Sequence, residues 1–276
     1  MKYFAFSTAS LYPMEPEKAA LAAFDAGYRD LEIFVNCEYE QTEEYIDLLN
    51  RLLEERGMRL HSFHPYMAGT EFFILFSEYD RRRREALAVY QRSIRAAAAM
   101  GAKWLILHGP GNRPTACREP LPHEIEVYKT LCDYGAQFGV GILQENVRNN
   151  LSRFPEYFTY LREAVPELGF NLDFKQALQA GFPLEDYIAA MGDRIQNLHI
   201  NDVDISGHCR LPGEGRLDYP YLFSLLEGVG YDGGLVTEVY RQDFETQDQI
   251  VTSRLFLEGE LLKYRLSRKK PLDSRD

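Results

Sequence analysis

Short apolar runs alternate with longer amphipathic segments about eight times along the chain, and this alternation restricts the fold more than any other feature. We expect a strand in each apolar run and a helix in each longer segment. The expected strands are residues 2–7, 30–34, 59–64, 104–108, 141–145, 168–173, 195–200 and 234–239. Repeated strand-then-helix units predict a parallel sheet, and eight such strands close into a barrel.

Proline, threonine and glycine residues mark the expected helix ends. Pro16 begins a helix because the first turn does not need the N–H that proline lacks, and the hydroxyl of Thr42 can accept a free N–H. Gly57 and Gly101 end the helices before them, because glycine readily adopts the left-handed conformation found there. The expected helices are residues 16–26, 42–56, 80–100, 121–138, 184–191, 219–227 and 247–264, with a further helix that begins at Pro155.

A doubly wound open sheet is the alternative architecture. It requires a glycine-rich phosphate loop after the first strand, whereas this chain continues there with Ser-Thr-Ala-Ser-Leu-Tyr-Pro. The prediction is therefore an α/β protein with a single (β/α)8 TIM barrel over residues 1–266 and a polar C-terminal tail over residues 267–276. A length of 276 residues suits one such barrel.

Charge and cysteine spacing disfavour several classes of protein. The formal net charge of −11 weighs against binding of nucleic acid through bulk electrostatics. No pair among the four cysteines has the spacing of a metal finger or a redox motif. Because we find neither a signal-peptide pattern nor an apolar run of membrane-spanning length, we expect a reduced cytoplasmic protein without membrane or nucleic-acid partners.

Acidic residues and histidines stand at or near the last position of the apolar strands. The positions, each on a different strand, are His64, His108, Glu145, Asp173, His199 and Glu238, while Glu32 lies within the second strand. In a barrel these strand ends open into one mouth, which is where the active sites of barrel enzymes are built.

The convergence of these ionisable groups predicts a bound divalent metal ion. A charged group at the end of a buried strand is costly unless it is paired or bound to metal, and carboxylate and imidazole are ordinary metal ligands. Taken singly, each histidine could be a hydrogen-bonded core residue, and a glutamate could pair with Arg148. Glu32 fits a structural hydrogen-bond acceptor as well as it fits a site residue.

The segment after the seventh strand, residues 208–215, is rich in turn formers and polar groups. Gly213 and Gly215 allow the backbone to approach a ligand closely. We expect this loop to lie over the mouth, with a simple connecting loop as the alternative.

Eight short stretches spread over nearly the whole chain carry a resemblance to a known family. They are LEIF (31–34), HSFHPY (61–66), LILHG (105–109), LQEN (143–146), NLDFKQALQAG (171–181), LHIND (198–202), LPGEGRLDY (211–219) and GLVTEVY (234–240). In this order they resemble the xylose isomerase-like TIM barrel superfamily. That group includes sugar phosphate isomerases and epimerases, ketose 3-epimerases, inosose dehydratase and the endonuclease IV type of repair enzyme.

The resemblance implies one divalent metal ion, with Mn2+ preferred and Mg2+, Co2+ or Zn2+ as alternatives. Similarity to the ketose 3-epimerases implies the metal ligands Glu145, Asp173, His199 and Glu238. Of these, Glu145 and Glu238 would also form the catalytic acid/base pair. The residues expected to contact substrate are His64, His108, Gln176, His208 and Glu214, and His64 and His108 are also candidates for a second metal.

The function implied is metal-dependent isomerisation or epimerisation of a ketose or related polyol. One glutamate would remove the proton next to the carbonyl, with the enediolate stabilised by the metal. Return of a proton to the opposite face gives an epimer, and transfer on one face gives an aldose–ketose isomerisation. The nearby acids Asp202, Asp204 and Glu214 disfavour a phosphate, so an unphosphorylated small molecule is expected. The superfamily also implies a homo-oligomer, without a specific interface in the sequence.

Three alternatives remain open. A dehydratase or lyase acting on a cyclic polyol would use the same site and the same first proton abstraction. An endonuclease IV-like nuclease would need three zinc ions. Gln176 replaces one expected histidine ligand, and the sequence Ser206-Gly207-His208 replaces the expected Asp-x-His motif. A barrel that only binds a sugar or a partner would leave its buried charges uncompensated.

Overall fold

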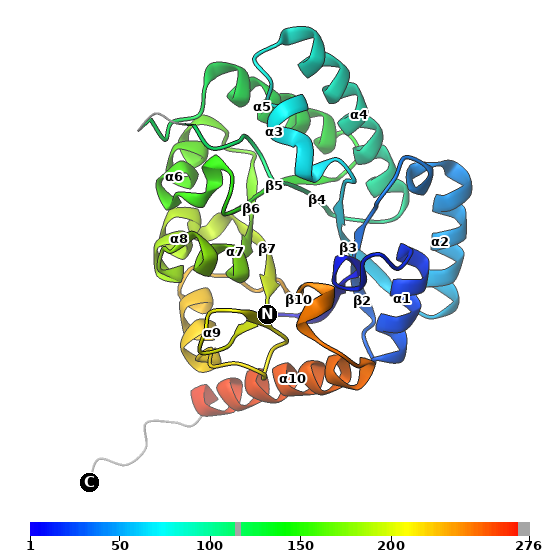
Figure 1. Cartoon of the computed structure of the whole chain (residues 1–276), viewed down its shortest axis with the longest axis vertical. Coiled ribbons are helices and arrows are strands. Elements are labelled where there is room, and N and C mark those ends of the chain that lie inside the picture. The colour runs from blue at the N-terminus through cyan, green and yellow to red at the C-terminus, as the bar shows by residue number, and fades with distance from the viewer. Residues whose placement is uncertain (114–116, 270–276) are drawn as a thin grey trace.

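Eight parallel strands form a closed barrel in the computed structural model, which describes residues 1–113 and 117–269. The strands form the inner ring and the helices lie outside it (Figure 1). The barrel strands are β1 (Tyr3–Ser7), β2 (Asp30–Phe34), β3 (Arg59–His64), β4 (Trp104–Leu107), β5 (Gly141–Glu145), β6 (Gly169–Asp173), β7 (Ile195–Ile200) and β10 (Gly234–Thr237). The predicted single (β/α)8 barrel is confirmed.

The helices begin and end close to the predicted positions. Pro16 is the first residue of its helix, and the hydroxyl of Thr42 accepts a hydrogen bond from the N–H of Tyr45. Gly57 and Gly101 have φ angles of 60° and 82°, in the left-handed region that ends the preceding helices. The outer helices are α1 (Pro16–Asp25), α2 (Glu43–Glu55), α4 (Asp80–Ala99), α5 (Pro122–Ala136), α6 (Pro155–Ala164), α8 (Leu184–Met191), α9 (Tyr219–Gly228) and α10 (Gln247–Lys269).

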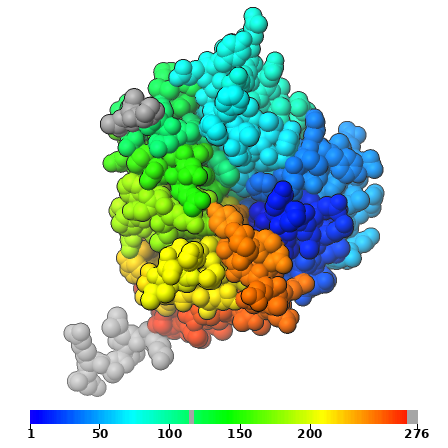
Figure 2. All heavy atoms as spheres, in the orientation of Figure 1, coloured from blue at the N-terminus to red at the C-terminus, as the bar shows by residue number. Residues whose placement is uncertain are grey.

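The barrel closes where the first strand pairs with the last. Phe4 of β1 lies opposite Leu235 of β10 in a parallel register, and Figure 2 shows the dark blue N-terminal segment beside the orange segment that precedes the red last helix. The apolar core fills the space inside and around the strands, where Leu31, Phe158 and Phe170 are fully buried. Burial of each such side chain contributes about 1.5–3 kcal/mol.

Several short elements were not expected from the sequence. A 3-10 turn η3 (Ala68–Thr70) and a helix α3 (Glu71–Ile74) follow β3, and α7 (Phe174–Ala180) begins directly after β6. After β7, two-residue strands β8 (Asp202–Val203) and β9 (Cys209–Arg210) form an antiparallel hairpin. These elements are too short for a hydrophobic period to be recognised.

The last helix extends beyond its predicted end at residue 264. It continues to Lys269, so the first three residues of the predicted tail 267–276 are helical. Residues 270–276 lie outside the described residues. Among the described residues, no helix is both long enough and apolar enough to cross a membrane.

Candidate metal centre

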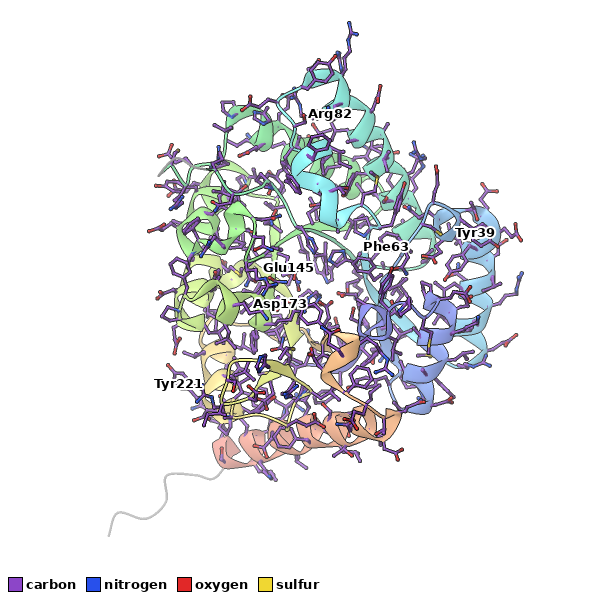
Figure 3. The ribbon with its side chains drawn as sticks, viewed as in Figure 1. Tyr39, Phe63, Arg82, Glu145, Asp173 and Tyr221 are labelled. Atoms are coloured by element: carbon purple, nitrogen blue, oxygen red, sulfur yellow. The ribbon has the colours of Figure 1, made fainter. Side chains whose placement is uncertain are left out.

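The strand register brings the predicted site residues to one level of the barrel. Asp173 lies opposite His199 in the pairing of β6 with β7, Glu145 is the last residue of β5, and Glu238 directly follows β10. Figure 3 places the labelled Glu145 and Asp173 near the middle of the ring. Because parallel strands end at the same edge of the sheet, these side chains meet in the mouth.

The four predicted metal ligands come together around the ring of His199. Three carboxylate oxygens lie 3.5 Å from Nδ1 of His199, namely Glu145 Oε1, Asp173 Oδ2 and Glu238 Oε2. His199 and Asp173 are fully buried, and Glu145 is 2% exposed. Three acidic side chains therefore surround one imidazole nitrogen, in a region with little access to solvent.

Glu32 binds the opposite side of the same histidine. Its carboxylate lies 3.0 Å from Nε2 of His199, and it accepts hydrogen bonds from Ser62 Oγ at 2.6 Å and Asn197 Nδ2 at 3.2 Å. A carboxylate on the far nitrogen of a metal-binding histidine fixes the tautomer and the orientation of the ring. The sequence left the role of Glu32 undecided, and the structure places it where it would orient His199.

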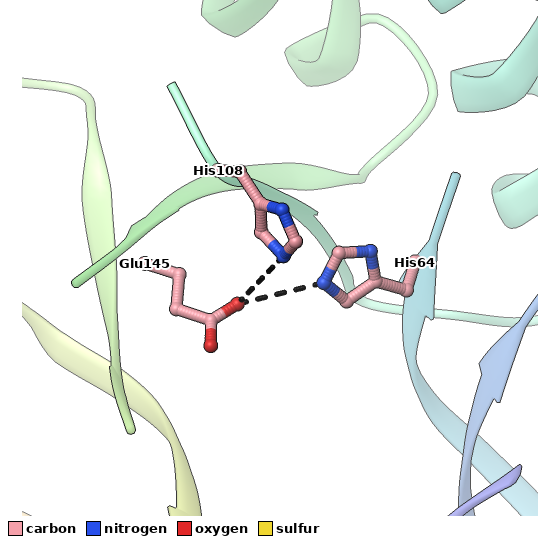
Figure 4. A group of neighbouring side chains, drawn as sticks. All are labelled: His64, His108 and Glu145. Carbon is pink, nitrogen blue, oxygen red and sulfur yellow. Dashed lines mark hydrogen bonds and ion pairs between the residues drawn. The ribbon is translucent and has the colours of Figure 1, made fainter. Parts of the chain in front are cut away.

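The second oxygen of Glu145 faces a pair of histidines. Nε2 of His64 and Nε2 of His108 each lie 3.5 Å from Glu145 Oε2 (Figure 4). The two rings meet edge to face, with their centroids 4.8 Å apart. The position suits both roles expected for these histidines, contact with substrate and binding of a second metal.

Burial and charge shift the pKa values of the carboxylates in opposite directions. Burial alone would raise the pKa of Glu145 and of Glu238, but it is outweighed by His199 together with His64 for Glu145, and by His199 together with Lys175 for Glu238. The pKa of Glu145 is held well below its usual range, and that of Glu238 falls to about 2. For Asp173 burial dominates, and its pKa is raised.

The histidines respond to the same charges. Burial would lower the pKa of His199, but the carboxylates of Glu238, Glu32 and Glu145 raise it well above its usual value. Burial and the neighbouring His64 lower the pKa of His108 to about 4. The carboxylates therefore stabilise the protonated form of His199.

Asp173 is held so that one of its oxygens faces the other ligands. Its Oδ1 accepts a hydrogen bond from the N–H of Gln176 at 2.9 Å, and Asn146 binds its backbone N–H and carbonyl at 2.7 and 2.8 Å. The buried Oδ2 accepts no hydrogen bond from the described residues. Such an oxygen, facing carboxylates and an imidazole, fits a divalent cation, and Glu145, Asp173 and His199 offer closely spaced ligand atoms.

Lys175 is a member of this group that the sequence analysis missed. Its Nζ lies 3.1 Å from Glu238 Oε1 and 3.5 Å from Asp173 Oδ2, and 4.5 Å from the centre of the Tyr240 ring. Burial would lower the pKa of Lys175, but Asp173 and Glu238 raise it well above its usual value. The available signal was a lysine in a largely apolar stretch, two residues after a predicted ligand.

The remaining predicted substrate contacts have partners outside this group. Gln176 is half-buried, and its Oε1 accepts a hydrogen bond from the N–H of Arg148 at 3.0 Å. His208 is exposed between β8 and β9, with Nδ1 3.5 Å from Asp204 Oδ2. Glu214 is exposed and accepts a hydrogen bond from Gln249 on α10 at 2.8 Å. The structure therefore does not bring His208 and Glu214 into the group around His199.

The glycines after β9 allow the loop to pack closely against another part of the protein. The N–H of Gly213 donates to Asp202 Oδ2 at 3.1 Å, and the Cα of Gly215 is so close to Asp202 and Val203 that a Cβ there would collide with both. Asp202 also accepts a hydrogen bond from Leu217 N–H at 2.9 Å. These glycines allow the loop to wrap around Asp202, whereas we expected them to admit a ligand.

Two sequence comparisons match most of the chain. A sequence profile described as "Xylose isomerase-like TIM barrel" matches residues 20–259. An uncharacterized protein of Mycobacterium tuberculosis is 24% identical over 283 residues, which cover 93% of this chain and 97% of that protein.

Two solved structures have the same architecture at low identity. A D-tagatose 3-epimerase-like protein superposes with a TM-score of 0.78 at 17% identity, covering 96% of this chain and 99% of that one. An L-ribulose 3-epimerase gives a TM-score of 0.77 at 16% identity, covering 98% and 100%. At these identities the likeness shows the fold alone.

Proposed function

Because the chain belongs to the xylose isomerase-like TIM barrel family, we propose that it is a metal-dependent sugar isomerase or epimerase acting on a ketose or related polyol. The observation that carries the proposal is the convergence of Glu145, Asp173 and Glu238 on Nδ1 of His199. Two solved structures of similar fold, those of a D-tagatose 3-epimerase-like protein and an L-ribulose 3-epimerase, support the substrate class.

Glu145, Asp173, His199 and Glu238 would hold one divalent ion, with Mn2+ preferred. When bound, such an ion supplies Lewis acidity to the substrate carbonyl and the adjacent oxygen. Glu32 would keep the ring of His199 in the orientation needed for binding, through its contact with Nε2.

Glu145 and Glu238 are the proposed acid/base pair. Each turns one oxygen towards His199, while the other faces a different neighbour: the His64–His108 pair for Glu145 and Lys175 for Glu238. Two carboxylates that reach the substrate from different sides can remove a proton from one face of a carbon and return one to the other face. That sequence inverts the carbon, whereas transfer by one group on one face gives an isomerisation.

We propose an unphosphorylated sugar as the substrate. His64 and His108 lie beside Glu145 and would bind hydroxyls of the sugar. Gln176 remains a further predicted contact. His208 and Glu214 remain predicted contacts from the hairpin side. Asp202 and Asp204 lie on that side too, and their negative charge disfavours a phosphate group.

The test is metal content together with proton exchange, measured on the chain purified without a metal-binding tag. We expect about one divalent ion per wild-type chain and incorporation of solvent deuterium into a ketose. Glu238→Gln should bind the ion more weakly and slow deuterium exchange by about 10²–10⁴-fold. Glu43→Gln, an exposed site on α2, is the matched control and should behave as wild type. Absence of bound metal, even with excess added, would rule out this function.

The group of His64, His108 and Glu145 favours one further candidate, a hydrolase or nuclease with more than one metal. Two or three zinc ions per chain, together with salt-dependent DNA binding, would support it.

A dehydratase or lyase would use the same site, and the mass of the product separates it from an epimerase because one molecule of water is lost.

A further inference from the structure

Lys175 occupies an unfavourable position for a cation. It lies in the first turn of α7, where the helix dipole opposes positive charge, and its side chain is 3% exposed. Burial of an ammonium group is costly unless carboxylates or other acceptors surround it. The neighbouring acids must therefore stabilise it strongly.

Those acids are two of the proposed metal ligands. The ammonium lies 3.1 Å from Glu238 Oε1, while Glu238 Oε2 faces His199. It also lies 3.5 Å from Asp173 Oδ2, the same oxygen that faces Nδ1 of His199. Lys175 thus shares Asp173 Oδ2 with the metal centre and holds the second oxygen of Glu238.

We propose that Lys175 is an internal competitor of the metal ion, which sets how tightly the centre binds a divalent cation. The proposal rests on the metal centre of the proposed function. An ammonium this close to two ligands repels a cation bound between them, because like charges interact strongly at short range inside a protein. It also balances part of the charge of the Glu32, Glu145, Asp173 and Glu238 carboxylates.

Two other roles for Lys175 predict different results. A lysine that mainly positions Glu238 would, when replaced, weaken metal binding, as is usual for residues that orient ligands. A lysine that only supports the fold would lower stability and leave metal affinity unchanged. The sign of the change in metal affinity therefore separates the three roles.

The experiment compares full-length variants stripped of metal with a chelator. Lys175→Met keeps an unbranched side chain that is one heavy atom shorter and removes its charge. Lys175→Arg keeps the charge, and Lys129→Met changes an exposed lysine on α5 as the matched control. Mn2+ affinity is measured by titration calorimetry, and thermal unfolding is followed with and without Mn2+.

Lys175→Met should bind Mn2+ at least about 10-fold more tightly than wild type. It should unfold at a lower temperature without metal and gain more from added Mn2+, because the ion then provides the missing positive charge. Lys175→Arg and Lys129→Met should stay close to the wild-type affinity. If Lys175→Met does not fold, Lys175→Gln provides the same comparison with a neutral side chain.

Unchanged or weaker binding by Lys175→Met, while wild type binds Mn2+, would overturn the competitor role and leave the proposed function standing. Binding by Lys175→Met alone would support the competitor role and overturn the proposed function of the wild-type chain. Failure of both proteins to bind any divalent ion would overturn this inference and the proposed function together.

Discussion

Asp30 and Glu32 lie two residues apart on β2, but the balance of charge around them differs. Asp30, at the amino end of the strand, receives two hydrogen bonds from Arg59 at 2.8 and 3.0 Å and lies 2.6 Å from His61 Nε2. Glu32, towards the mouth, is fully buried and contacts His199, which three further carboxylates approach. One acid thus has two basic partners, whereas the other belongs to a group in which acids are in excess.

The origin of the partners explains this difference. Arg59 and His61 belong to β3, the strand next to β2, so the charge of Asp30 is balanced locally. His199 belongs to β7 and reaches Glu32 across the barrel. Asp30 at the amino end is therefore neutralised by the neighbouring strand, while the mouth has an excess of acidic side chains that the proposed metal ion would balance.

The largest effect that tests this comparison is expected from Glu32→Gln. Loss of the carboxylate frees the ring of His199, and the affinity for Mn2+ should fall about 10–100-fold. Titration calorimetry on the metal-free chain measures the change. Wild-type affinity in this variant would mean that Glu32 serves only the packing of the barrel.

Asp30→Asn should leave metal affinity unchanged and lower the free energy of unfolding by about 1–2 kcal/mol at neutral pH. Burial alone would raise the pKa of Asp30, but the hydrogen bonds from His61 and Arg59 outweigh it, and the folded-state pKa is lowered. Its stabilisation is therefore complete above the usual aspartate pKa of about 3.9 and is lost as the pH falls through the lowered folded-state value.

Urea unfolding as a function of pH checks both parts of that prediction. The gap between wild type and Asp30→Asn should be constant near neutral pH and close in acid. A gap that widened in acid would contradict the assignment of Asp30 as an ionised, paired carboxylate. A change in Mn2+ affinity would contradict the separation of the two barrel ends.

The smallest effect is expected from Lys2→Met, also at the amino end. Lys2 Nζ lies 2.6 Å from Asp232, but both side chains are about two-thirds exposed, at 68% and 66%. Solvent and salt screen such pairs, so neither the urea midpoint nor the metal affinity should change measurably. A clear loss of stability would show that even exposed pairs at this end support the barrel.

Much of the fold could be predicted because its signals are local. Pro16, Thr42 and Gly101 mark helix ends through backbone chemistry that involves only a few neighbouring residues. The positions of Glu145 and Asp173 at the ends of apolar strands likewise needed only the hydrophobic period and the rule that barrel strands end together. The hairpin of β8 and β9 escaped prediction because strands of two residues have no period.

The sequence by itself determined the barrel, the starts of its outer helices and the carboxylates and histidines at the strand ends, because hydrophobic periodicity and capping act over a few residues. Only the tertiary structure decided which charges meet. Glu32 and His199 are 167 positions apart, and Lys175 reaches Glu238 across 63 positions. The compensation of one charge by another depends on distances that closure of the barrel sets, and no local pattern encodes those distances.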